Sequence, residues 1–205
     1  MNIKEILNED EKDCLQELMN IAYGSATAAI TEILDAFATL SIPKIEIIKT
    51  KELKDYLSKE VCLDSAHFVC MQQINGVIAG ENLFVIDKES AYNIALKFGL
   101  EEDEITNNEL SDIILEITNI LSSSTISKLA EDMHVSVSFS PPDVKILDTI
   151  SKLDNQFIEK YQNVIIISTR LKFEDLDIDG ELLILTTDKS IDYIKKIINK
   201  ILEEL

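Results

Sequence analysis

Two short sets of polar residues, one in each half of the chain, have side chains and spacing suited to chemistry. They are Asp13, Glu17 and Asn20 in the first half, and Asp112, Glu116 and Asn119 in the second. The spacing Asp-x3-Glu-x2-Asn places its members on one face of an α-helix, because residues three and four apart are neighbours there. A carboxylate can pair with a cation of a partner, whereas a carboxamide both donates to and accepts from water without titrating.

These polar faces have two interpretations. An amphipathic helix normally has a solvated polar face, so one Glu-x-x-Asn segment alone indicates little. The recurrence of the same residue types favours a function, since solvation requires polarity and not identity. Asn is also a mediocre residue within a helix, so its presence in both copies needs a reason. A capping role or a structural hydrogen bond of the Asn is the remaining alternative.

Helical periodicity and turn signals predict the elements that position these residues. A long helix is expected from an N-cap at Asn8 to about residue 37, followed by strands at 44–50, 67–74 and 81–86 and a helix at 88–98. In the second half, Thr106 and Glu109 predict a capping box for a helix that ends near residue 133. Strands are expected at 135–139, 163–171 and 181–186, and Asp188 is expected to cap a last helix.

The two halves match at a nearly constant offset. Adding 99 converts Asn20 to Asn119 and Pro43 to Pro142, and adding 100 converts Gly80 to Gly180. We therefore predict an α+β fold with a mainly antiparallel sheet flanked by the two long motif-bearing helices. Tandem duplication would make one domain, 1–205, from two pseudo-symmetric repeats at about 8–99 and 107–205. The prolines are expected to fix the backbone where each helix leads into its first strand.

Composition excludes several classes of function. The 205 residues carry a formal net charge of −19, which argues against nucleic acid and anionic membranes as partners. The hydrophobic content of 46% is enough for a folded core, and no run approaches the roughly 18 apolar residues of a membrane span. Three unpaired cysteines and the absence of a leader pattern favour the cytoplasm. No metal-ligand spacing and no standard enzyme motif is present, so neither a metal site nor a cofactor in this chain is expected.

The paired motifs, each followed by its proline, resemble the CheC family of chemotaxis phosphatases. The segments 17–24 and 116–121 are similar to the Glu-x-x-Asn-Ile stretches of that family, and the likeness extends over nearly the whole chain. The resemblance implies dephosphorylation of a phosphorylated CheY-type receiver. It implies that Asn20 and Asn119 place the attacking water and that Glu17 and Glu116 dock the receiver. Asp13, Asp112, Pro43 and Pro142 would support the motifs, and Mg²⁺ would belong to the phosphorylated partner.

Three alternatives stay open. The chain could be a non-catalytic scaffold of the same fold, as in flagellar-switch proteins, although both Glu/Asn pairs are intact and no added switch domain is expected after Leu205. It could bind CheD, the receptor deamidase, which is compatible with phosphatase activity. It could resemble the CheX type, which has a single motif, although two motifs favour CheC. Cys14 lies next to Asp13 and raises the question of redox control, but neighbouring acids raise a thiol's pKa and oppose it.

Overall fold

The computed structural model describes residues 6–60, 66–148, 152, 162–173, 176 and 178–204. In this part of the chain one antiparallel sheet has the strand order β1-β7-β8-β4-β3-β5, with β2 also beside β7 and β6 also beside β3. The strands are β1 (Thr39–Leu40), β2 (Lys44–Lys49), β3 (His67–Gly76), β4 (Gly80–Asp87), β5 (Val137–Phe139), β6 (Asp143–Leu147), β7 (Asn163–Phe173) and β8 (Ile178–Thr187). The helices are α1 (Glu9–Leu34), α2 (Leu53–Glu60), α3 (Lys88–Lys97), α4 (Asn107–Asp132) and α6 (Asp188–Glu203), and a 3-10 turn precedes α2.

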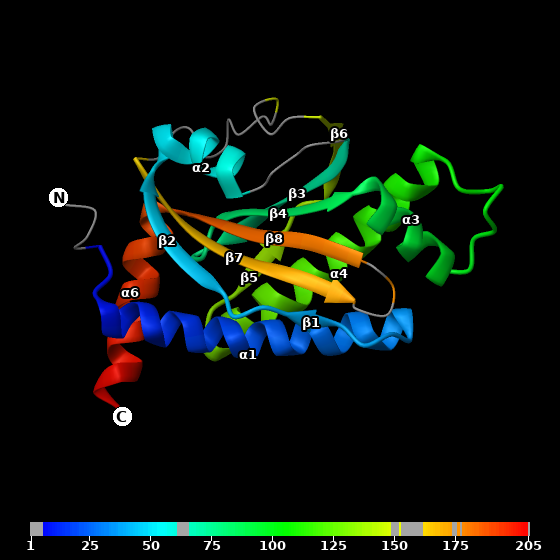
Figure 1. Cartoon of the computed structure of the whole chain (residues 1–205). Helices are drawn as coiled ribbons and strands as arrows, with labels where there is room; N and C mark the ends of the chain where they lie inside the picture. The colour runs from blue at the N-terminus through cyan, green and yellow to red at the C-terminus, as the bar shows by residue number, and fades with distance from the viewer. Residues whose placement is uncertain are drawn as a thin grey trace.

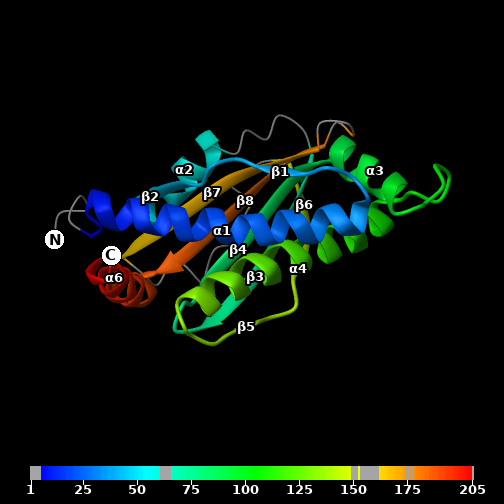
Figure 2. The ribbon, with the colours of Figure 1, turned by 90° about the horizontal axis from the view of Figure 1, so that it is seen from below.

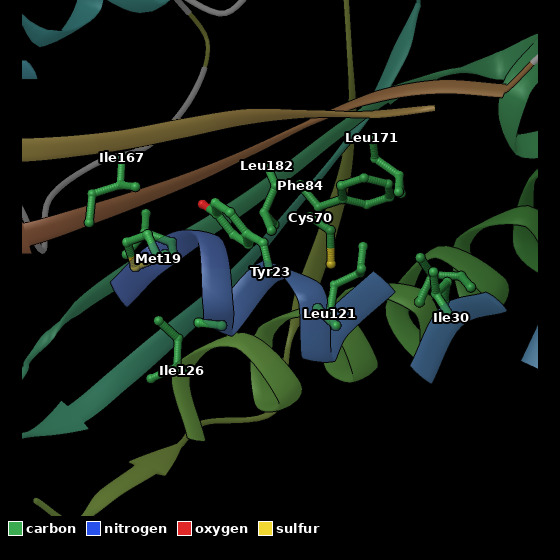
Figure 3. Close-up of a cluster of buried hydrophobic side chains, with 14 of the residues drawn as sticks. Met19, Tyr23, Ile30, Cys70, Phe84, Leu121, Ile126, Ile167, Leu171 and Leu182 are labelled. Carbon is green, nitrogen blue, oxygen red and sulfur yellow. The ribbon is translucent and has the colours of Figure 1, made fainter. Parts of the chain in front are cut away.

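The two long helices lie side by side on one face of the sheet (Figures 1 and 2). They run antiparallel, as the colour gradient along each helix shows in Figure 2. Between them and the sheet lies the main core, in which Met19 and Tyr23 of α1 and Leu121 of α4 are buried against Phe84 and Leu182 (Figure 3). Burial of this apolar surface fixes the inner side of each helix and leaves the opposite side, which carries the motif, in solvent.

The other face of the sheet has a smaller core. Leu53 and Leu57 of α2 cover Val69, Val85 and other outward-facing strand residues. The predicted α+β class with a mainly antiparallel sheet is therefore confirmed. The helix α2 was not predicted.

The helix α1 begins where its sequence predicts. Asn8 is the N-cap, and its side chain and that of Glu11 form a reciprocal capping box through two 2.8 Å bonds. The end was predicted about three residues too late, because Asp35 adopts a left-handed conformation with φ of 45°. Such a residue ends the hydrogen-bond ladder whatever the apolar pattern beyond it.

Two predicted caps differ from the structure. Thr106 is the N-cap of α4, but its hydroxyl donates to the Glu109 carboxylate, so the contact with Glu109 joins two side chains. Thr187, not Asp188, caps α6. The Asp188 carboxylate instead accepts from the backbone N–H of Gln162 and Asn163 and holds the start of β7.

Each half contains four strands where three were predicted. The short strand β1 and the strand β6 were missed, because β1 has only two residues and β6 is a partly charged edge segment. Both halves therefore contain a long helix, four strands and a closing helix in that order, and the first half adds α2 between β2 and β3. The first two strands of each half pair with the other half: β1 and β2 with β7, and β5 and β6 with β3. This order is what a duplication would give, and the duplication itself stays a prediction.

Candidate functional site

The first motif lies on the solvent side of α1. Asp13, Glu17 and Asn20 are all exposed, while Leu15 and Met19 between them are buried. The side chains of Glu17 and Asn20 make no hydrogen bond or ion pair within the described residues. Gly24, one turn further on, is exposed, and a Cβ there would meet nothing within 4 Å. This face is therefore open to another macromolecule.

The second motif lies on the solvent side of α4 in the same way. Asp112, Glu116 and Asn119 are exposed, and Ile117 and Thr118 point into the core. The Glu116 side chain makes no bond to any residue the structure describes. Because each motif lies in the N-terminal half of its helix and the helices are antiparallel, the two motifs lie toward opposite ends of the helix pair (Figure 2).

The two asparagines have different surroundings. The Oδ1 atom of Asn119 accepts a 3.1 Å hydrogen bond from Nε2 of Gln72 on β3. No corresponding bond to Asn20 occurs among the described residues. Gln72 is a residue that the sequence reasoning missed. Its signal was present, because it interrupts the inward-facing series Phe68, Cys70 and Ile74 with a polar side chain.

Each proline lies in the turn between the first and second strands that follow its motif helix. Pro43 is buried directly before β2, and Pro142 is half-buried directly before β6. The carbonyl of Pro43 accepts a 2.6 Å bond from Nε2 of Gln16, which ties the first loop to α1. Gln16 was also missed, since its position between two motif residues suggested only a polar face.

The loops before both prolines share a set of hydrogen bonds. Ser41 Oγ accepts from the Arg170 N–H at 3.0 Å, and Ser140 Oγ accepts from the Gln73 N–H at 3.1 Å. The Ser41 and Ser140 N–H groups donate to the carbonyls of Arg170 and Gln73. Ser140 is Ser41 plus 99. Each motif helix is therefore followed by a loop anchored on a strand of the other half.

A shallow groove of about 560 Å³ borders the first motif. It lies between α1 and α6 and is lined by Asp13, Cys14, Glu17, Leu18 and other residues, including Ile201 and Leu202. The α1 wall carries acidic side chains beside Leu18, and the α6 wall is apolar. The arrangement suits a partner with both a cation and an apolar side chain.

The two described cysteines are free thiols. Burial raises the pKa of the Cys14 thiol. Burial, opposed by a hydrogen bond from Thr118, raises the pKa of Cys70 to about 11. A raised pKa lowers the thiolate fraction and hence reactivity, so neither thiol has the signature of a redox sensor. Cys62 lies outside the described residues.

The described residues contain neither a metal-binding cluster nor a membrane-spanning helix. No group of three or more His, Cys, Asp or Glu side chains is placed to hold a metal ion. No helix in the described ranges has the length and hydrophobicity needed to cross a membrane.

A family model described as "Chemotaxis phosphatase CheX" matches residues 68–152. The match includes Gln72, Glu116 and Asn119 and does not reach the first motif. The flagellar motor switch phosphatase FliY of Bacillus subtilis (strain 168) is 22% identical over 174 residues, which are 83% of this chain and 44% of FliY. The chain thus spans under half the length of this curated relative.

Solved structures share the fold. FliY of Thermotoga maritima has a TM-score of 0.74 at 21% identity, covering 95% of this chain and 98% of that one. The FliM middle domain of H. pylori has a TM-score of 0.63 at 10% identity, with coverages of 93% and 99%. The CheX in a CheX-CheY-BeF3-Mg complex from Borrelia burgdorferi has a TM-score of 0.55 at 16% identity, with coverages of 84% and 97%.

The chain is therefore similar to the CheX phosphatase family over residues 68–152 and to the phosphatase FliY over most of its length. These matches are to CheX and FliY, so the CheC type that the two motifs indicate stays a prediction. The roles of the individual motif residues stay predictions.

Proposed function

We propose that this chain hydrolyses the aspartyl phosphate of a CheY-type response-regulator receiver in the cytoplasm, as a step of chemotaxis signalling. The observation that carries the proposal is the pair of exposed Glu/Asn faces at equivalent positions of two long helices. Its support from relatives is the likeness to CheX and to the phosphatase FliY.

The chemistry asked of the asparagines is modest. An acyl phosphate is already activated, so a catalyst needs mainly to hold a water molecule in line with phosphorus. A carboxamide can do this at any physiological pH, as the water-positioning Gln of GTPases does. Asn20 and Asn119 would each accept from and donate to that water.

The glutamates would fix the pose of the receiver. Glu17 and Glu116 each lie one helical turn before the Asn and are exposed without a partner in the described structure. A lysine at the receiver's active site would pair with this carboxylate and bring the phosphate beside the Asn. Mg²⁺ would come with the phosphorylated receiver. Asp13 and Asp112, one turn earlier, would add to the local negative potential.

The proposal includes two sites in one chain, the CheC-type arrangement. Both helices present the same residue types on their solvent sides, and both are followed by a loop anchored in the same way. A protein of CheX type needs one such motif, so the activity of the first motif distinguishes the two arrangements.

The experiment measures phosphate release from a phosphorylated CheY-type receiver with the wild type, Asn20→Ala, Asn119→Ala and the double variant. The double variant should fall to the spontaneous rate, because no carboxamide is left to place water. A double variant as active as the wild type contradicts the mechanism. Ser127→Ala, a change on the exposed side of α4 beyond the motif, is the matched control.

The alternative is a non-catalytic scaffold or binding module, favoured by the likeness to the FliM middle domain. A wild-type protein that never exceeds the spontaneous rate, with or without added CheD, supports the scaffold. Acceleration only with CheD would identify the deamidase as a partner and activator.

A further inference from the structure

Gln72 is a buried amide beneath the second motif. It is 1% exposed and lies in the middle of β3 on the side that faces the helices. Its Nε2 atom donates to Asn119 Oδ1 at 3.1 Å and to the Ser140 carbonyl at 3.0 Å. Burying an amide is unfavourable unless its groups are bonded, so these two bonds account for both N–H donors.

The bond to Asn119 restricts an otherwise exposed side chain. An exposed Asn normally samples several rotamers, and holding one in advance removes an entropic cost from the reaction. With Oδ1 tied to the sheet, Nδ2 and the second lone pair of Oδ1 are left for water. Gln72 thus holds the Asn119 carboxamide, the group that would place the attacking water under the proposed function.

The position that corresponds to Gln72 by strand register in the other half has a different residue. Lys44 pairs with Ser168, and Asp143, which is Lys44 plus 99, pairs with Met71. Thr169 therefore corresponds to Gln72. Thr169 Oγ1 donates to the Ser41 carbonyl at 2.6 Å, as Gln72 does to Ser140.

Threonine keeps the loop contact and loses the contact with the motif. Its hydroxyl has one hydrogen to donate, whereas the amide nitrogen of Gln72 has two. In the described structure Thr169 makes no bond to Asn20. The first asparagine is therefore free to rotate where the second is held.

The residues opposite Gln72 and Thr169 on the neighbouring strands also differ. Asn82 lies directly opposite Gln72 in the β3–β4 pair and is 1% exposed. Both amide atoms of Asn82 and the Oε1 atom of Gln72 lack partners among the described residues. Directly opposed side chains lie within reach of each other, so Asn82 can supply the donor that Gln72 Oε1 needs. Asn82 plus 100 is Leu182, which is apolar.

We propose that Gln72 is a positioning residue for Asn119 and that it makes the second motif the preorganised site of the two. This rests on the proposed function for the reaction, while the hydrogen bond itself can be tested without it. The first motif then depends on the docked partner to order Asn20.

The test compares variants in an Asn20→Ala background, so that only the second motif contributes. Gln72→Met removes the donor at similar volume and should lower the maximal rate of phosphate release from the phosphorylated receiver about tenfold. The receiver concentration at half-maximal rate should change less than twofold, because Glu116 and the outer surface are untouched. Thr169→Val is the matched control and should leave the maximal rate unchanged.

The outcomes separate the inference from the function. If Gln72→Met keeps the full rate while Asn119→Ala abolishes it, the positioning role is wrong and the function stands. If the Asn20→Ala protein itself shows no acceleration, the proposed activity of the second motif is wrong. Rates then say nothing of Gln72, and the hydrogen bond is tested by NMR.

The side-chain amide signal of Asn119 in ¹⁵N NMR decides in that case. It should shift in the Gln72→Met protein and remain in place in Thr169→Val, and an unmoved signal in Gln72→Met overturns the inference. Should Gln72→Met fail to fold, Gln72→Leu removes the same donors without burying a charge and replaces it in both measurements.

Discussion

The exposed Glu and Asn side chains of the motifs make no hydrogen bond in the described structure, except for Asn119, which is bonded to the sheet. Glu116 has no bonded neighbour in the described structure, so its carboxylate is available to pair with a cation of a partner. Asn119, three residues later, is exposed but tied to β3 through Gln72. Under the proposed function, docking and water placement would fall to two residues three positions apart, of which Asn119 is bonded to the sheet and Glu116 is not.

Neutralising Glu116 tests the docking role. In an Asn20→Ala background, Glu116→Gln should raise the receiver concentration at half-maximal rate about threefold, the value of an exposed ion pair. The maximal rate should change less, because the Asn119 carboxamide is intact. Steady-state kinetics with the phosphorylated receiver measure both. Glu131→Gln, the same change on the same helix about four turns away, should alter neither, and an equal effect of both variants would show that only net charge matters.

The elements that carry the motifs are held at their ends by specific contacts. Glu11 in the first turn of α1 is 2% exposed, and its carboxylate accepts from the Asn8 N–H and lies 3.2 Å from Lys195 of α6. Lys195 also donates to the Ile6 carbonyl at 2.8 Å. This cluster joins the first and last helices beside the first motif, so the groove there depends on it.

The Glu11 cluster makes stability depend on pH. Burial raises the pKa of Glu11, but hydrogen bonds from Asn8, Asn199 and Lys195 outweigh it and lower the pKa from its usual 4.5. A lowered pKa means that the stabilisation is present above pH 4.5 and is lost as the pH falls through the folded value. Glu11→Gln should lower the free energy of unfolding by about 2 kcal/mol at pH 7.

Urea unfolding at several pH values measures this effect. The difference between the wild type and Glu11→Gln should shrink below pH 4.5, and a difference that is constant down to pH 3 would contradict it. Glu9→Gln is the control, since the Glu9 side chain is 86% exposed and its one ion pair within the described residues is with Lys12 at the surface. It should change the unfolding free energy by less than about 0.5 kcal/mol.

The contact between β4 and β8 leaves no room for a side chain at Gly80. A Cβ there would lie 2.2 Å from the Leu185 carbonyl oxygen, a backbone atom that cannot rotate away. Gly80→Ala should therefore destabilise the fold by about 3 kcal/mol. Thermal or urea unfolding measures it.

Gly24→Ala gives the opposite expectation within the same measurement. Its Cβ meets nothing within 4 Å, and alanine is the better helix former, so a gain of about 0.5–1 kcal/mol is expected. Equal effects of the two substitutions would show that the close approach of the Leu185 carbonyl is not the reason why Gly80 resists substitution.

At the scale of the whole molecule, the net charge and the positions of the motif acids affect how fast a charged partner associates. The formal net charge is −19, and the motif acids lie on exposed helix faces at two distant places. Under the proposed function, an acidic receiver would be repelled by the whole molecule and attracted locally by each motif. The two effects differ in range, because screening weakens the long-range repulsion first.

The rate at low receiver concentration should therefore rise with salt and then fall. The rise reflects screening of the global charge, and the fall reflects screening of the local ion pairs. Measuring phosphate release across a sodium chloride series tests this with an acidic receiver. A rate that only falls from the lowest salt would contradict the picture, and Glu116→Gln in the Asn20→Ala background should flatten the falling part.

The sequence by itself determined the local features. The Asp-x3-Glu-x2-Asn spacing put the motif residues on one helix face, and the structure places them there in solvent. The N-cap at Asn8 and the main strands were also predicted, since caps and apolar periodicity act within a few residues. The left-handed Asp35 and the two-residue strand β1 were missed, because neither leaves a periodic signal.

Only the tertiary structure decided how the halves combine. The pairing of β2 with β7 and of β6 with β3 joins residues more than 70 positions apart, and no local pattern specifies such contacts. The same pairing brings Gln72 beneath Asn119 and Thr169 to the corresponding place in the other half. Two motifs with the same three polar residues therefore differ in the hydrogen bonds that support them, since strands distant in the chain supply those bonds.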